Sequence, residues 1–106
     1  AGLRYAAERA MAGKPPLTGP VVVDVVAGMP IPQSWSRKKQ AQALAGIIRP
    51  TTRPDWENIG KMLDALNEIV WRDDAQVVDG RVRKVYREAP SLSIKVTPLE
   101  IGVLAA

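Results

Sequence analysis

The sequence of 106 residues contains no cysteine and no histidine. Without cysteine, the chain has no disulfide, no thiolate nucleophile and no cysteine-ligated zinc or iron–sulfur site. The absence of histidine removes the commonest general base and the commonest ligand of transition metals. Any catalysis must therefore depend on carboxylates, lysine, tyrosine and hydroxyl groups, and any metal site must be built from hard oxygen ligands.

Long apolar segments are missing as well. The longest apolar run, VVVDVVAGM, is interrupted by Asp24 and is far shorter than the ~20 residues that cross a bilayer. No segment resembles a signal peptide. We therefore expect a cytoplasmic protein that does not associate with a membrane.

The length of the chain suits one domain with a single core. Fifteen Lys and Arg residues stand against 11 Asp and Glu residues, which gives a formal net charge of +4. This charge favours a polyanionic partner such as nucleic acid, but many soluble proteins without such a partner carry a similar charge. Charge alone leaves both interpretations open.

Hydrophobic spacing predicts three helices. The first covers residues 2–13 and ends at Gly13, the second covers residues 36–47, and the third covers residues 58–70. The third carries apolar residues at i, i+3, i+4 and i+7, which is typical of a helix with one buried face.

The second helix is expected to begin with Ser34 or Ser36 as its N-cap. Its first turn carries Arg37, Lys38 and Lys39, where the helix dipole disfavours cations by a few tenths of a kcal/mol per charge. This placement is mild evidence that the three cations serve an anionic ligand. A solvated, lysine-rich turn is the equally weighted alternative.

Three strands are predicted around these helices. Residues 21–26 are β-branched and apolar on both faces except for Asp24, which indicates an interior strand. A lone aspartate there is more often a strand-end or hydrogen-bonded structural residue than a ligand. Residues 75–86 and 91–97 alternate between apolar and polar, and the short connection between them predicts a hairpin. The order predicts an α+β fold, with helices packed on a small mixed β-sheet.

Acidic residues gather in two places. Asp55 and Glu57 lie two residues apart, so an extended backbone would direct both carboxylates the same way. From these two residues alone, Asp55 is more often the N-cap of a helix than a catalytic residue. Asp73 and Asp74 follow the third helix, which at about twelve residues is ~18 Å long. Spacing alone therefore does not bring the two pairs together.

The chain contains, in this order, PDWEN, a lysine three residues later, DALN, VWRDDAQVVD and VRK. This ordered set resembles the signature of the RusA-like endodeoxyribonucleases, the Holliday junction resolvases of phages and prophages. The resemblance covers Met29 to about Val96. It implies that residues 1–106 form a single RusA-like nuclease domain. The strand with which that family usually begins is absent before Ala1, so we expect a fragment or a trimmed chain.

The resemblance also implies the site. The family's catalytic residues fall on Asp55, Glu57, Asp74 and Lys61, and its metal ligands on the same three acids with Asp73 beside them. Glu57 departs from the aspartate usual there, and its extra methylene is expected to alter the metal geometry. Three carboxylates ~4 Å apart repel by about 4 kcal/mol per pair at an effective dielectric of ~20. All-oxygen ligands suit Mg²⁺, or else Mn²⁺, as the ion that relieves this repulsion.

The implied function is a structure-selective endodeoxyribonuclease that resolves four-way DNA junctions by Mg²⁺-dependent phosphodiester hydrolysis. Paired symmetric nicks imply a two-fold homodimer. One alternative is a non-catalytic module that binds branched DNA through the same fold with a weakened metal site; another is a nuclease for other branched or flap DNA.

Cations and tryptophans complete the expectations. Trp35, Trp56 and Trp71 are expected as anchors of the core or of a dimer more than as base-stacking groups. The candidates for contacts with DNA phosphates are Arg37, Lys38, Lys39, Arg81, Arg83 and Lys84.

Overall fold

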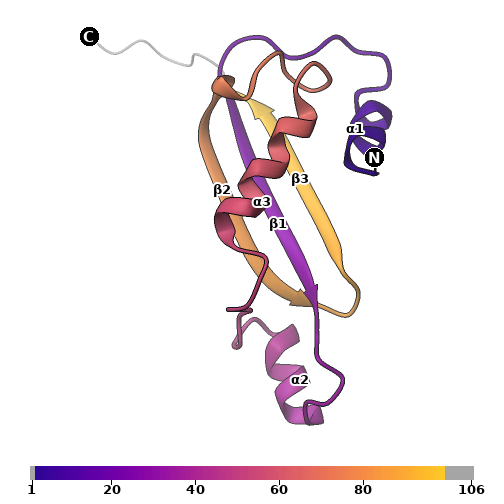
Figure 1. Ribbon diagram of the computed structural model, residues 1–106, viewed down its shortest axis with the longest axis vertical. Coiled ribbons are helices and arrows are strands. Elements are labelled where there is room, and N and C mark those ends of the chain that lie inside the picture. Colours follow the sequence, from indigo (N-terminus) through magenta and orange to yellow (C-terminus); the bar gives the residue numbers. More distant parts are fainter. Residues whose placement is uncertain (1, 100–106) are drawn as a thin grey trace, which may run out of the picture. The chain divides into compact units, whose positions relative to one another are not determined.

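The computed structural model, which describes residues 2–99, has the predicted α+β architecture. Its elements are α1 (Gly2–Met11), β1 (Val21–Pro30), α2 (Arg37–Leu44), α3 (Trp56–Lys61), the 3₁₀ helices η1 (Met62–Leu66) and η2 (Asp74–Gln76), β2 (Val77–Arg87) and β3 (Ser91–Pro98). The strands form one sheet in the order β2-β1-β3. Because β2 runs with β1 and β3 runs against it, the sheet is mixed (Figure 1).

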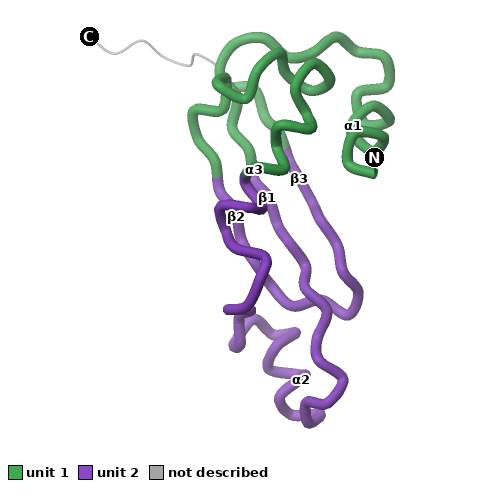
Figure 2. Tube along the Cα trace, viewed as in Figure 1, with its two compact units in different colours: residues 1–23, 61–80, 96–106 green, residues 24–60, 81–95 purple. Residues whose placement is uncertain are grey.

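The described chain divides into two compact units (Figure 2). Unit 1 contains residues 2–23, 61–80 and 96–99, and unit 2 contains Asp24–Gly60 and Arg81–Lys95. Each strand has a segment in each unit. Among residues 2–99, no helix is long and apolar enough to cross a membrane.

Each unit has its own buried apolar residues. In unit 1, Trp71 is fully buried, and Leu66 and Val70 are also buried. In unit 2, Ile59 and Tyr86 are buried, and the Tyr86 ring meets the Trp35 ring edge-on at 5.3 Å between centroids. The expectation that tryptophans anchor the core is therefore confirmed for Trp71.

Strand β1 is the centre of the sheet, as the run of valines predicted. Val21, Val23 and Val25, which share one face of the strand, are at most 1% exposed, whereas the alternate residues Val22, Asp24 and Val26 are partly exposed. The strand continues beyond the predicted end at residue 26 to Pro30.

The predicted hairpin of the last two strands is wrong. β2 and β3 are not paired with each other, because β1 lies between them. The connection from Arg87 to Ser91 crosses the end of β1 at Gly28. A Cβ atom on Gly28 would lie 2.3 Å from Ser91 Oγ and 2.7 Å from Arg87 Cγ, so the crossing requires glycine there.

The predicted helix over residues 58–70 is also only partly present. The α-helix α3 begins at Trp56 and ends at Lys61, and η1 follows it. The chain then turns back at Glu68, whose φ of 68° lies in the left-handed region. This turn is fixed by Trp71, whose indole Nε1 donates to Asn67 Oδ1 at 2.7 Å and whose carbonyl accepts from Glu68 N at 2.7 Å.

The first two helices agree with the sequence. α1 ends where Ala12 and Gly13 adopt positive φ values of 50° and 80°, as expected of a helix that stops at glycine. Ser36 is the N-cap of α2, and its side chain accepts a hydrogen bond from Lys39 N at 3.2 Å.

Candidate active site

The acidic turn before β2 is built by its own side chains. Asp73 has an extended backbone and caps η2, since its Oδ1 accepts from Ala75 N at 2.8 Å. Gln76 completes a capping box: its Oε1 accepts from Arg72 N at 2.8 Å and from Asp73 N at 3.1 Å. The sequence DDAQ therefore contains the hydrogen-bonding groups that shape the turn.

Gln76 also ties this turn to a distant part of unit 1. Its Nε2 donates to the carbonyls of Leu17 at 3.0 Å and Gly19 at 2.9 Å. Leu17 N in turn donates to Val70 O at 2.7 Å. Gln76 thus fixes the position of the backbone at Asp74. The sequence analysis did not assign this positioning role to Gln76.

Three carboxyl groups of unit 1 come together at Asp74. Hydrogen bonding with the Asp64 carboxyl, then with that of Asp73, raises the pKa of Asp74 from 3.8 to about 6, with smaller contributions from burial and charge repulsion. Asp64 lies in η1 and opens the DALN motif, the one signal that could have singled it out. The sequence analysis assigned no role to Asp64.

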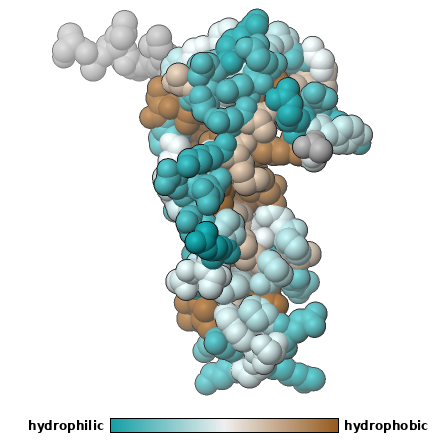
Figure 3. Space-filling model, viewed as in Figure 1, coloured by the Kyte–Doolittle hydropathy of each residue, from teal (hydrophilic) through white to brown (hydrophobic). Residues whose placement is uncertain are grey.

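Asp55 and Glu57 lie in unit 2, at the start of α3. The Asp55 carbonyl accepts from Ile59 N at 3.2 Å, so Asp55 occupies the position that precedes the first helical residue. Glu57 lies in the first turn of α3 and Lys61 at its end, and both are exposed. Residues along α3 are coloured mainly as hydrophilic in the space-filling view (Figure 3). The convergence of Asp55 and Glu57 with Asp74 stays a prediction.

The donor set fits a hard divalent cation in its chemistry. Within residues 2–99, no group of three or more acidic side chains is arranged so that it could hold a metal ion. Asp64 and Asp73 each interact with Asp74, however, and hydrogen bonding with them raises the pKa of Asp74. Carboxylate oxygens in such a cluster are the ligands that Mg²⁺ and Mn²⁺ accept.

Two of the predicted DNA-contacting cations have partners inside unit 2. Arg83 Nη2 lies 3.1 Å from Asp24 Oδ2 and 3.3 Å from Oδ1, which confirms the structural role expected of Asp24. Lys84 Nζ donates to the Thr52 carbonyl. Both side chains are thereby held against the protein.

The remaining predicted cations are exposed. Arg37, Lys38 and Lys39 lie in the first turn of α2, and Arg81 lies on β2. The Lys39 ammonium lies 4.0 Å from the centre of the Trp35 ring, a cation–π contact.

Positive charge is concentrated in unit 2. Its sequence holds ten Lys and Arg residues and four Asp and Glu residues, a formal charge of +6. Because the whole chain carries +4, the rest of the sequence carries −2. The cations and most of the acids are therefore sorted into different parts of the fold.

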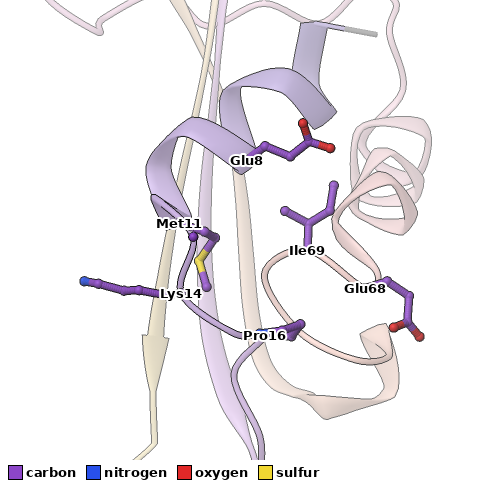
Figure 4. Close-up of a pocket in the computed structure, with 7 residues that line it drawn as sticks. Glu8, Met11, Lys14, Pro16, Glu68 and Ile69 are labelled. Atoms are coloured by element: carbon purple, nitrogen blue, oxygen red, sulfur yellow. The ribbon is translucent and has the colours of Figure 1, made fainter.

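A separate pocket of about 280 Å³ lies in unit 1, between α1 and the loop that carries Glu68 and Ile69 (Figure 4). Met11, Lys14 and Pro16 also line it. The pocket contains none of the predicted catalytic, metal-binding or DNA-binding residues.

A small mixed sheet and a strongly basic unit are together typical of a domain that binds a polyanion. The chain belongs to the RusA endodeoxyribonuclease family, because the family model described as Endodeoxyribonuclease RusA matches residues 2–97. The family predicted from the motifs is thus confirmed.

A curated relative is the uncharacterized protein YqaN of Bacillus subtilis (strain 168). It is 45% identical to this chain over 83 residues, which cover 76% of this chain and 58% of that protein. The chain therefore spans less than two thirds of the length of this relative.

Proposed function

We propose that this chain is the nuclease domain of a structure-selective endodeoxyribonuclease, which resolves four-way DNA junctions by Mg²⁺-dependent phosphodiester hydrolysis. The observation that carries the proposal is the match to the RusA family over residues 2–97. The acidic cluster around Asp74 and the charge of +6 on unit 2 support it, because a nuclease of this kind needs both a cation site and a phosphate-binding surface.

The proposed metal ligands are Asp55, Glu57 and Asp74, with Asp73 beside them. A divalent cation supplies acidity to a bound water and stabilises charge on the scissile phosphate and the leaving oxygen. Because hydrogen bonding with Asp64 raises the pKa of Asp74 to about 6, a cation bound there would have to displace the proton that this carboxyl retains below that pH.

Other residues have roles that do not depend on the cation. Gln76 and Asp73 fix the backbone of the turn, so that the Asp74 carboxylate is oriented before DNA arrives. Lys61 is proposed to contact the scissile phosphate or to orient water. Arg37 and Lys38 are proposed to contact DNA phosphates.

Paired nicks require two copies of the site. A junction has two-fold symmetry, so two strands are cut symmetrically if two domains form a homodimer with a two-fold axis. The dimer is part of this proposal.

Nuclease assays on the purified protein test the proposal. A labelled four-way junction and a linear duplex with the same arms are incubated with and without Mg²⁺. We expect nicking of the junction alone, at symmetric positions, and only with Mg²⁺ or Mn²⁺. Asp74→Asn should abolish nicking and preserve junction binding, whereas Asp79→Asn, which changes an exposed aspartate of β2 outside the cluster, should cut as the unmodified protein does.

One observation favours a second candidate, a non-catalytic module that binds branched DNA. Glu57 replaces the aspartate expected at the second acidic position and places its carboxylate one methylene further from the backbone. If the protein binds junctions tightly and cuts none with Mg²⁺ or Mn²⁺, while Glu57→Asp cuts, the binding module is the correct function. A panel of flaps and three-way junctions separates the third possibility, a nuclease for other branched DNA.

A further inference from the structure

Trp56 is an exposed tryptophan in the middle of the PDWEN motif. Its side chain is 60% exposed, whereas Trp71 is 0% exposed. An aromatic ring of this size in water loses the stabilisation that burial would give, ordinarily about 1.5–3 kcal/mol for a large apolar side chain. Trp56 is thus not a core residue, and its exposure calls for another explanation.

The orientation of this ring is fixed through its polar edge. The indole Nε1 donates to the Val82 carbonyl at 3.0 Å. Val82 belongs to β2, an edge strand of the sheet, so this carbonyl is available to a side chain. With its N–H used in this way, the ring keeps its apolar faces for an outside partner.

The segment before α3 follows the same edge of unit 2. In addition to the Trp56 bond, Lys84 of β2 donates to the Thr52 carbonyl. The segment before α3 thus contacts β2 at Val82 and at the Lys84 side chain. The Trp56 bond satisfies one backbone carbonyl of this edge.

Several cations lie near Trp56, together with the two acids that adjoin it in sequence. Arg53 lies three residues before it, and Arg81 and Arg83 flank Val82 in β2. The formal charge of unit 2 is +6. An exposed aromatic ring among cations is the combination with which proteins bind unpaired nucleotides: the base stacks on the ring and the cations contact the backbone.

We propose that Trp56 is a stacking platform for an unstacked base at the branch point of the DNA substrate. The proposal rests on the proposed function, since it assumes branched DNA as the ligand. Inside a linear duplex both faces of each base are covered by neighbouring bases, whereas a base at a branch point can have a free face. Because Asp55 and Glu57 adjoin Trp56 in sequence, a base stacked on this ring would bring its backbone to the predicted catalytic acids. Trp56 would then make the site selective for branched DNA.

Binding measurements without cleavage test this inference. The affinities of Trp56→Ala and Trp56→Phe for a four-way junction and for a linear duplex are measured in EDTA. We expect Trp56→Ala to weaken junction binding about 5- to 150-fold, the range for loss of one stacked base, and to leave duplex binding unchanged. Ile47→Ala is the matched control, because Ile47 is an apolar residue of unit 2 that is 72% exposed; it should bind as the unmodified protein does.

The phenylalanine variant separates stacking from a structural role. Phenylalanine keeps an aromatic face and lacks the N–H that Val82 accepts. If Trp56 serves only to satisfy that carbonyl, both variants lose stability and junction affinity alike, and the inference is overturned. If Trp56 stacks on a base, Trp56→Phe retains most of the junction affinity.

A fluorescent base gives a direct readout. With 2-aminopurine at the branch point, stacking on Trp56 should quench its emission when the protein binds, and Trp56→Ala should remove that quenching. If Trp56→Ala weakens binding to junction and duplex equally, Trp56 makes a general DNA contact and the inference is wrong. If Trp56→Ala converts a dimer to a monomer, Trp56 makes a contact between subunits and the inference is also wrong. Failure of the unmodified protein to cut junctions with Mg²⁺ counts against the proposed function alone, because the stacking measurements contain no metal.

Discussion

At the scale of single residues, the Asp74 carboxyl makes stability depend on pH. Its pKa is raised from 3.8 to about 6, first of all by Asp64, so the folded protein binds a proton more readily than the unfolded chain between these values. The contribution to stability is therefore fully present below pH 3.8 and is lost as the pH rises through about 6.

Asp64→Asn is expected to remove most of this dependence. Melting temperatures of the variant and the unmodified protein are compared in EDTA from pH 4 to about 7. The two temperatures should be similar at low pH, and the variant should melt at the higher temperature above about pH 6. Asp79→Asn serves as the control for a change in net charge and should leave the profile intact. An NMR titration that places Asp74 at its ordinary pKa would contradict the prediction.

Some residue roles were predictable from the sequence and others were not. Asp24 was recognised as structural because a single acid in an apolar strand needs a partner, but the identity of Arg83, 59 residues away, depends on the sheet order. Asp64 was overlooked because helical spacing places it on a polar face, where the ordinary expectation is solvent.

At the scale of secondary-structure elements, η2 depends on one side chain. Gln76 makes four hydrogen bonds: two accepted from Arg72 N and Asp73 N, and two donated to Leu17 O and Gly19 O. Gln76→Ala should lower the free energy of unfolding by about 2–6 kcal/mol, since each of the four bonds contributes about 0.5–1.5 kcal/mol. Urea denaturation measures the loss. Gln76→Glu should also destabilise the protein, because its carboxylate cannot donate to the carbonyls of Leu17 and Gly19.

Gly28 permits the crossing from β2 to β3. Gly28→Ala is expected to destabilise the protein by about 1–3 kcal/mol, because its methyl group would overlap Ser91 Oγ and Arg87 Cγ. In a Ser91→Ala background the cost should be smaller, and a double-mutant cycle measures the difference. Gly60→Ala is the control: a Cβ there meets nothing within 4 Å, so it should be neutral or stabilising.

The two errors at this scale have a common cause. Alternating residues in 75–86 and 91–97 identify two strands, but no local pattern reveals that a third strand separates them. Likewise the apolar spacing of residues 58–70 continues through η1, and only the burial of Trp71 and its bonds to Asn67 and Glu68 turn the chain back. Local periodicity predicts elements, whereas their ends and neighbours follow from long-range contacts.

At the scale of the whole molecule, the uneven charge predicts how DNA binding responds to salt. Replacing Arg37, Lys38 and Lys39 together by Gln should reduce the slope of log affinity against log salt concentration by up to about 3, since each phosphate contact contributes about 0.9. Filter binding to a duplex between 50 and 200 mM salt, the range over which such slopes are ordinarily measured, checks it.

Two control variants accompany this measurement. Lys14→Gln changes an exposed lysine of unit 1, outside the basic unit, and should leave the slope unchanged. Arg83→Gln should reduce stability more than slope, because it leaves Asp24 without its ion pair. If either control variant removed the salt dependence of binding, the DNA would not contact the first turn of α2.

The position of β1 between β2 and β3 has a consequence for the order of folding. The central strand is complete by Pro30, but both of its neighbours come from Val77 onwards. During synthesis the valine-rich segment therefore has no strand to pair with until Val77 has been made. The sheet can close only after Pro98 has left the ribosome.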